Sequence, residues 1–180
     1  GPGNMVIDAL VAEHTNLASA YDKNGRLAAK GRVDTRLLDA LLKDHYYRIP
    51  PPKSAGREQY GEVFLKKLKK AKLPMLDLIA TATAFTAATI AVGIQRFAPP
   101  AKRLIVSGGG VHNPRIMANL AAYLPELKIE TSADYGIDPD AKEAIAFAIL
   151  AHETWNRRPS NLPAATGARH PVILGDITPV

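Results

Sequence analysis

The sequence predicts an α/β fold with short, mostly parallel strands and a helix-rich N-terminal part. Three observations lead to this expectation. Apolar residues recur at helical spacing through the first half of the chain, whereas short strand-like runs alternate with helices after residue 102. A length of 180 residues, with 47% hydrophobic and 22% charged residues, is typical of one globular domain or one lobe of a larger enzyme.

The N-terminal part contains the start signals of two helices. Asn4 is expected to cap the first helix, and Asp34 is expected to cap a second helix that carries a stripe of leucines. The segment between these helices, residues 21–31, is expected to lie on the surface because it contains the turn-forming pair Asn24-Gly25.

Prolines divide the middle of the chain. Pro50-Pro51-Pro52 ends the second helix, and a further helix is expected from about Gln59 to Lys70. Pro74 begins a long helix to about Phe97, whose many small side chains allow neighbouring elements to approach closely. This pattern predicts a buried central helix. Pro99-Pro100 then marks the clearest boundary in the sequence.

The part after this boundary has the order of a parallel α/β unit. Its elements are expected at residues 103–106 (strand), 114–124 (helix), 128–131 (strand), 141–156 (helix) and 172–174 (edge strand). The first strand is joined to its helix by Ser107-Gly108-Gly109-Gly110, and Asn113-Pro114 opens that helix. A strand, a helix and a second strand in this order predict a right-handed crossover.

The composition excludes several classes of protein. The chain has no cysteine, which excludes disulfide scaffolds, thiolate zinc sites and thiol nucleophiles, and its five histidines show no metal-ligand spacing. No uninterrupted apolar run reaches the roughly 18 residues of a membrane helix, and no secretory signal opens the chain. A cytoplasmic location without a membrane partner is therefore expected.

The charge is positive, with a formal net charge of +6. Five lysines between Lys66 and Lys72 could contact a nucleic-acid backbone, or they could be the solvated end of a helix. Phe64 is the sole aromatic residue close to them in the sequence, whereas nucleic-acid readers usually interleave aromatic and basic residues. A solvated helix end is therefore favoured, and nucleic-acid binding is the weaker alternative.

The glycine turn after the first strand is the strongest local signal. Without side chains at Gly108, Gly109 and Gly110, a flat or anionic ligand can lie directly on the backbone, beside the N-terminus of the next helix. Such turns bind nucleotides in open α/β sheets, although the spacing matches neither Gly-x-Gly-x-x-Gly nor a Walker loop. A tight strand-to-helix turn without a ligand remains the alternative.

Two further stretches combine a helix start with a carboxylate. Gly1-Pro2-Gly3-Asn4 can cradle a phosphate, and Asp8 one turn later can hold the water shell of Mg²⁺. The alternatives are a tag remnant at Gly1-Pro2 and a solvent-facing Asp8. Glu143 opens an almost entirely apolar helix, where its carboxylate can orient a sugar hydroxyl or act simply as a favourable helix-start residue.

Six motifs in a fixed order resemble those of the anhydro-N-acetylmuramic acid kinase family. They are Gly1-Pro2-Gly3-Asn4-Met5-x-x-Asp8, Pro51-Pro52-Lys53-Ser54-x-Gly56-Arg57-Glu58, Ser107-Gly108-Gly109-Gly110-x-x-Asn113-Pro114, the stretch from Tyr135 to Ala148, the stretch from Asn161 to Ala168, and Leu174-Gly175-x-Ile177-x-Pro179. The resemblance also argues that Gly1 to Asn4 are native residues.

The resemblance implies a fold and an activity. The fold is a ribonuclease H-like or actin-like ATPase lobe of the actin, hexokinase and sugar-kinase superfamily, in which two lobes hold ATP in the cleft between them. The activity uses water to open the 1,6-anhydro ring while ATP, with Mg²⁺, phosphorylates the 6-oxygen. The product is N-acetylmuramic acid 6-phosphate, in peptidoglycan recycling.

The resemblance also implies roles for individual residues. Gly1, Gly3 and Asn4 belong to a loop that meets the β- and γ-phosphates, and Glu143 contacts the sugar. The adenosine loop comprises Ser107, Gly108, Gly109, Gly110 and Asn113.

The family's general-base Asp is expected just before Gly1. Residues 1–180 are therefore expected to be the C-terminal, nucleotide-binding lobe, with the N-terminal lobe as missing partner. In isolation this lobe is expected to bind ATP weakly and to be inactive. The chain could also form a homodimer. The alternative function is a stand-alone nucleotide-binding or regulatory module without catalysis.

Overall fold

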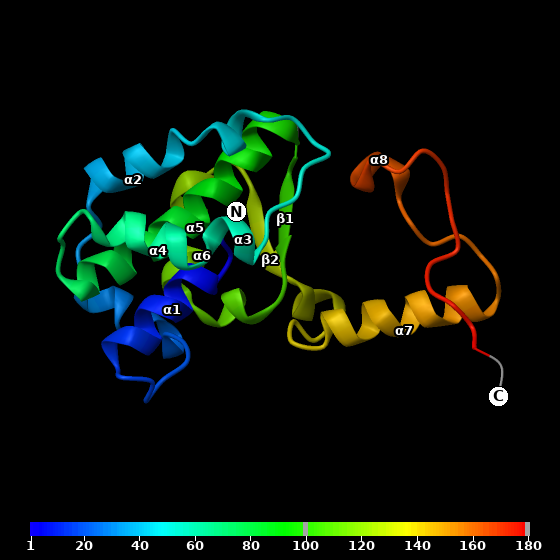
Figure 1. Cartoon of the computed structure of the whole chain (residues 1–180), viewed down its shortest axis with the longest axis horizontal. Coiled ribbons are helices and arrows are strands. Elements are labelled where there is room, and N and C mark those ends of the chain that lie inside the picture. Colours follow the sequence, from blue (N-terminus) through cyan, green and yellow to red (C-terminus); the bar gives the residue numbers. More distant parts are fainter. Residues whose placement is uncertain (99–100, 179–180) are drawn as a thin grey trace.

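The computed structural model describes residues 1–98 and 101–178, and it consists of a helical body with a projecting arm (Figure 1). The predicted boundary at Pro99-Pro100 and the final Pro179 of the last motif lie outside the described residues. The α-helices are α1 (Met5–His14), α2 (Thr35–Leu42), α3 (Arg57–Tyr60), α4 (Glu62–Lys69), α5 (Met75–Phe97), α6 (Pro114–Tyr123), α7 (Lys142–Trp155) and α8 (Pro163–Thr166). The strands are β1 (Arg103–Val106) and β2 (Lys128–Thr131), and the 3-10 turns are η1 (Lys23–Gly25), η2 (Ala28–Lys30), η3 (His45–Arg48), η4 (Gly109–His112) and η5 (Ser132–Tyr135).

Helix α5 is the centre of the body, as predicted. Its small side chains allow α1, α2 and α6 to pack closely around it, and its residues from Leu78 to Thr89 are all buried. The ring of Phe85, fully buried, lies edge-on to Tyr47 and stacks with Phe64. By length and composition α5 could also cross a membrane, but 72% of its most apolar window is buried, as expected for a core helix.

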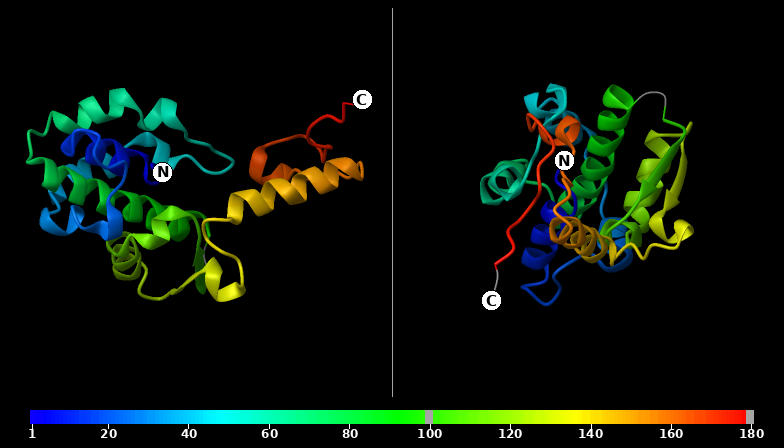
Figure 2. Two further views of the ribbon diagram at one scale, coloured as in Figure 1. Left: turned by 90° about the horizontal axis from the view of Figure 1, so that it is seen from below. Right: turned by 90° about the vertical axis from the view of Figure 1, so that its right-hand side faces the viewer.

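The predicted parallel unit is present as β1, α6 and β2. The two strands pair in parallel from Arg103 opposite Lys128 to Val106 opposite Thr131. This sheet lies beside α6 on one side of the body (Figure 2). The α/β class with a short parallel sheet and a helix-rich N-terminal part is thereby confirmed, whereas the ribonuclease H-like or actin-like lobe stays a prediction.

The predicted edge strand at residues 172–174 is wrong. In the described chain this segment lies in the arm, away from the sheet (Figure 1). The Val172 N–H donates to Asn161 Oδ1 at 2.6 Å, and the Val172 carbonyl accepts from the Ser160 N–H at 3.2 Å. Local loop partners therefore replace the strand partners that the apolar run suggested.

Two helix predictions also need correction. The single helix expected from about Gln59 to Lys70 is divided into α3 and α4 at Gly61, whose ψ of −148° is not helical. Asn4 occupies the N-cap position of α1, but its side chain makes no capping hydrogen bond. By contrast, Asp34 caps α2 as predicted, with its carboxylate accepting from the Leu37 N–H at 2.7 Å.

Helix α7 is exposed, although most of its residues are apolar. None of its described residues is buried, and the side chains of Phe147 and Trp155 are 71% and 73% exposed. The helix projects from the body, and the segment that follows it runs alongside (Figures 1 and 2). Asp140 precedes α7 but does not cap it, because the N-cap residue is Ala141 and has no side-chain cap.

Phe85 tests whether α5 organises the core. Replacement of this fully buried ring by alanine should leave a cavity and lower the free energy of unfolding by about 3–5 kcal/mol. The change is measured by urea denaturation. Val63→Ala on α4 is the control, because its side chain is 81% exposed and should change stability by less than about 0.5 kcal/mol. Equal stability of the two variants would contradict this arrangement of the core.

Candidate functional site

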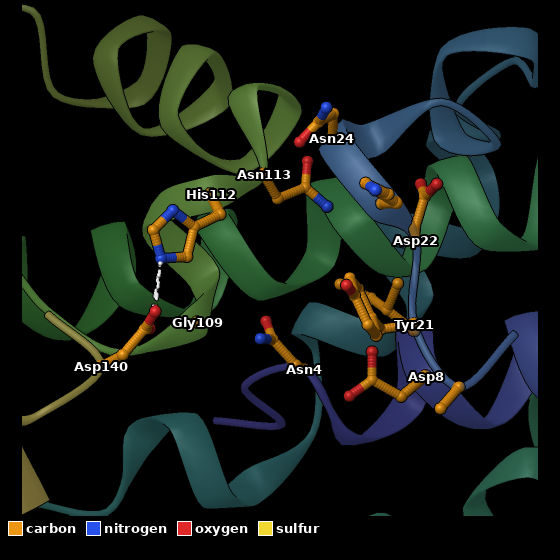
Figure 3. A pocket seen from close by; sticks show the side chains of 12 residues that line it. Asn4, Asp8, Tyr21, Asp22, Asn24, Gly109, His112, Asn113 and Asp140 are labelled. Carbon is orange, nitrogen blue, oxygen red and sulfur yellow. Dashed lines mark hydrogen bonds and ion pairs between the residues drawn. The ribbon is translucent and has the colours of Figure 1, made fainter.

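One pocket joins the two glycine-containing loops that the sequence analysis identified separately. It has a volume of about 560 Å³ and lies between the start of α1, the segment of residues 20–24, and the turn that leads into α6 (Figure 3). Its lining residues are Asn4, Ile7, Asp8, Ala20, Tyr21, Asp22, Lys23, Asn24, Gly109, His112, Asn113 and Asp140. Of the predicted site residues, Asn4, Asp8, Gly109 and Asn113 are thereby brought together.

Helix α5 positions the N-terminal loop. The hydroxyl of Thr86 donates to the Gly3 carbonyl at 2.7 Å, and Gly3 has a positive φ of 56°, which favours glycine. A Cβ atom at Gly1 would stand only 2.5 Å from Thr89 Oγ1, so this close approach requires a glycine. The threonines of α5 therefore hold the loop in place below the pocket.

The side chain of Asn4 lies against the glycine turn. A Cβ atom at Gly109 would be 3.7 Å from Asn4 Nδ2, and one at Gly110 would be 3.5 Å from Asn4 Oδ1. Because Asn4 caps no backbone group, its carboxamide is available to a ligand. Bare backbone and this carboxamide together form a polar floor that suits an anionic group.

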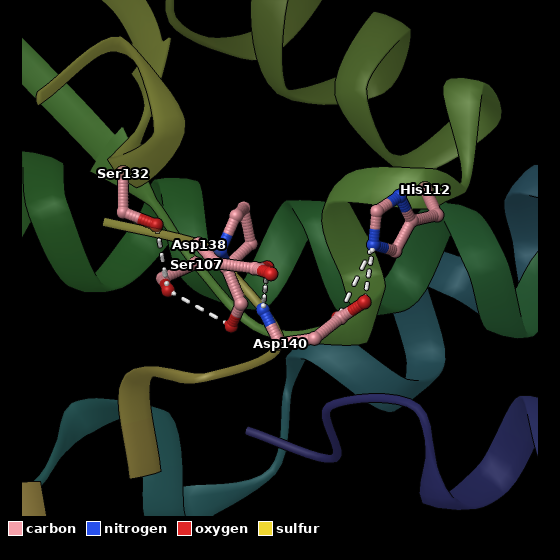
Figure 4. A network of polar contacts seen from close by, with 6 residues as sticks. Ser107, His112, Ser132, Asp138 and Asp140 are labelled. Carbon is pink, nitrogen blue, oxygen red and sulfur yellow. Dashed lines mark hydrogen bonds and ion pairs between the residues drawn. The ribbon is translucent and has the colours of Figure 1, made fainter. Parts of the chain in front are cut away.

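The glycine turn is tied to the segment that leads into α7 (Figure 4). The Gly108 N–H donates to the Pro139 carbonyl at 3.0 Å, and Gly108 has a φ of 86° that favours glycine. The Ser107 hydroxyl donates to the same carbonyl at 3.3 Å and lies 3.0 Å from Ser132 Oγ. The hydroxyl of Ser107 therefore orders the protein around the turn.

Asn113 fixes the start of α6, as predicted. Its Oδ1 accepts from the N–H groups of Arg115 and Ile116, at 3.0 and 3.4 Å. With Oδ1 held in this way, the Nδ2 group is directed to the pocket side (Figure 3). One carboxamide thus caps the helix and offers a donor to a ligand.

Three carboxylates line the pocket, and two of them are engaged by protein groups. Asp22 is buried and accepts from the Leu27 and Ala28 N–H groups at 2.8 and 2.9 Å. Asp140 pairs with His112, with 3.0 Å between Oδ2 and Nε2. The third, Asp8, is half-buried, and this burial raises its pKa from 3.8 to about 6, with a smaller contribution from the nearby charge of Asp22.

The remaining predicted residues lie outside the pocket lining. Five of them belong to the two loops and contribute to their conformation without lining the pocket: Gly1, Gly3, Ser107, Gly108 and Gly110. Glu143 is exposed in the first turn of α7 and does not line the pocket. Among the residues that the structure describes, no group of three histidine or acidic side chains could hold a metal ion, so the water-mediated Mg²⁺ at Asp8 stays a prediction.

The pocket wall formed by residues 20–24 was not predicted from the sequence. Residues 21–31 were expected to lie on the surface, and most of them are exposed, but Asp22 and Gly25 are buried. The Asn24-Gly25 turn itself is confirmed, with φ values of 56° and 63°. A Cβ at Gly25 would be 2.6 Å from Asn113 Oδ1, so the turn packs directly against the start of α6. The dipeptide Asn24-Gly25 predicted the turn, but no local sequence pattern predicted that the turn packs against α6.

Asp8 makes stability depend on pH. Because its folded pKa is raised, its contribution to stability is fully present below about pH 4 and is lost as the pH rises through about 6. Asp8→Asn should remove this loss, so the variant should be more stable than the wild type at pH 7. Urea denaturation at several pH values measures the effect, with Asp39→Asn as an exposed control outside this pocket. An unchanged decline between pH 4 and 6 in Asp8→Asn would contradict the assignment.

Comparisons with known proteins agree with the six motifs. The model of the family described as anhydro-N-acetylmuramic acid kinase matches residues 1–180. A curated anhydro-N-acetylmuramic acid kinase of Xanthomonas oryzae pv. oryzae is 45% identical over 180 residues, which are 99% of this chain and 47% of that protein.

Two further relatives of the same name match almost the whole of this chain. The protein of Caldanaerobacter subterraneus subsp. tengcongensis is 40% identical over 99% of this chain and 47% of its own length. That of Synechococcus elongatus is 43% identical over 98% of this chain and 48% of its own length. The chain spans about half the length of the curated relatives it matches. From the match over its whole length, the chain belongs to the anhydro-N-acetylmuramic acid kinase family.

Proposed function

We propose that this chain forms the nucleotide-binding side of an ATP-dependent anhydro-N-acetylmuramic acid kinase. The single observation that carries the proposal is the shared pocket, in which Asn4 of the N-terminal loop lies against Gly109 of the glycine turn. Family membership makes a sugar kinase the expected enzyme, and a kinase requires a nucleotide site. The reaction proposed for the whole enzyme opens the 1,6-anhydro ring with water and phosphorylates the 6-oxygen to give N-acetylmuramic acid 6-phosphate.

The donors in the pocket suit the phosphates of ATP. The backbone at Gly109 carries no Cβ atom, and the neighbouring carboxamide of Asn4 supplies N–H donors. ATP supplies the phosphoryl group when it is bound. The chain's own residues hold and orient the phosphates, and Asp8 is proposed to accept hydrogen bonds from the water shell of Mg²⁺.

The other parts of the kinase remain proposals. We propose that the half of the relatives' length outside this chain supplies the opposite side of the cleft, and that Glu143 approaches the sugar when the two sides meet. Other parts of the expectation stay predictions. They are the assignment of this chain to the C-terminal lobe, a general base that precedes Gly1, the inactivity of the isolated chain, the formation of a homodimer, and a cytoplasmic location.

The nucleic-acid alternative is less well supported. Lys66 pairs with Glu62 at 2.6 Å, and Lys69 pairs with Glu13 at 2.8 Å. Both lysines lie in the last turn of α4, where the helix dipole favours cations. The lysine cluster therefore fits a solvated helix end.

Gly109→Val tests the nucleotide site. The backbone at this position does not require glycine, and the nearest atom to an added Cβ is 3.7 Å away, so the fold should be retained. A branched side chain in the pocket should weaken ADP binding at least about tenfold, or 1.4 kcal/mol, by isothermal titration calorimetry.

Gly93→Ala on α5 is the matched glycine control. No atom lies within 4 Å of the added Cβ, and Gly93 does not line the pocket. Its ADP affinity should equal that of the wild type. Wild-type ADP affinity in Gly109→Val, with a cooperative unfolding transition, would contradict the proposed function.

A further inference from the structure

The wall of the pocket opposite the glycine turn carries an exposed aromatic side chain. Tyr21 lines the pocket although 57% of its side chain is accessible to solvent. In Figure 3 its ring lies between Asp8 and Asn24, and it faces the cavity across from Asn113. An accessible ring in a polar pocket is a ready surface for a flat ligand.

The backbone that carries Tyr21 is held on both sides. Ahead of it, the Ser19 hydroxyl donates to the Tyr21 carbonyl at 2.9 Å. After it, the carboxylate of Asp22 accepts two backbone N–H groups, as described above, and the following turn packs on Asn113. The ring is thus presented from a fixed loop, and binding a ligand there requires little ordering of the backbone.

The pocket offers both kinds of contact that a nucleobase needs. A base presents a π-face, which stacks on an aromatic ring, and a polar edge, which accepts and donates hydrogen bonds. Tyr21 provides the ring, and the Nδ2 group of Asn113 provides a directed donor because its Oδ1 is held by α6. The glycine turn and Asn4 lie on the other side of the pocket, where the phosphates are proposed to bind.

From this placement we infer that Tyr21 is the platform on which the nucleobase of ATP stacks, and that Asn113 Nδ2 donates to the polar edge of that base. The inference rests on the proposed function. It assigns a binding role to a segment that the motifs of the sequence do not include. It also predicts that base size determines affinity, because a purine covers more of the ring than a pyrimidine does.

Tyr21→Ala and Tyr21→Phe test the stacking directly. Three probes are titrated into each variant by calorimetry: ADP, CDP, and inorganic tripolyphosphate, which has phosphates but no base. Tyr21→Ala should weaken ADP binding about tenfold, leave tripolyphosphate unchanged and abolish the preference for ADP over CDP. Tyr21→Phe keeps the ring and should retain wild-type affinity for all three probes. Thermal unfolding confirms that each variant is folded.

The outcomes separate the inference from the proposed function. Unchanged ADP affinity in Tyr21→Ala, when Gly109→Val weakens ADP, would overturn the stacking role and leave the nucleotide site intact. An equal loss of ADP and tripolyphosphate in Tyr21→Ala would also overturn it, because the ring would then act on the structure of the whole pocket. If Gly109→Val does not weaken ADP either, the nucleotide site is wrong and the inference fails with it.

Discussion

The close approach of the N-terminal loop to the glycine turn is the constraint on which the pocket depends. The loop can reach the turn because α5 presents small and hydroxyl-bearing side chains beneath it, with Thr86 bonded to the Gly3 carbonyl. The side chain of Asn4 lies directly against the turn, because Cβ atoms added at Gly109 and Gly110 would be 3.7 and 3.5 Å from it. The tightest contact is at Gly1, where an added Cβ atom would stand 2.5 Å from Thr89 Oγ1, so a larger residue there would push the N-terminal loop away from α5.

The charges around the pocket follow from the same arrangement. Asp22 and Asp140 are committed to the protein, the first to backbone N–H groups and the second to His112. Asp8 is left partly desolvated next to Asp22, which raises its pKa to about 6. With its pKa near 6, this carboxyl group is mostly ionised at pH 7 and can accept hydrogen bonds there. The pocket therefore combines hydrogen-bond donors that suit an anion with one carboxyl group, that of Asp8, whose pKa is raised.

The sequence predicted those features that depend on local chemistry. The parallel strand unit, the caps at Asp34 and Asn113, the buried α5 and the turn at Asn24 were all visible as spacing or residue type. The glycine turn and the N-terminal loop were each identified as ligand sites, but only the ordered resemblance to a family suggested that they act together.

The features that were missed depend on tertiary contacts. Gly61 interrupts a helix that its neighbours favoured, and the apolar run at 172–174 found partners in a nearby loop. Helix α7 has a core-like composition but projects from the body with its aromatic residues exposed. The wall at residues 20–24 exists because its turn packs on α6, a contact between segments about 90 residues apart that no local pattern encodes.

Amide chemical-shift mapping during an ADP titration tests most directly whether the two loops form one nucleotide site. The arrangement described here predicts saturable shifts in both loops together, at Asn4 and at Gly109, with the same dissociation constant. Shifts confined to the lysines between Lys66 and Lys72, or to one loop alone, would contradict it.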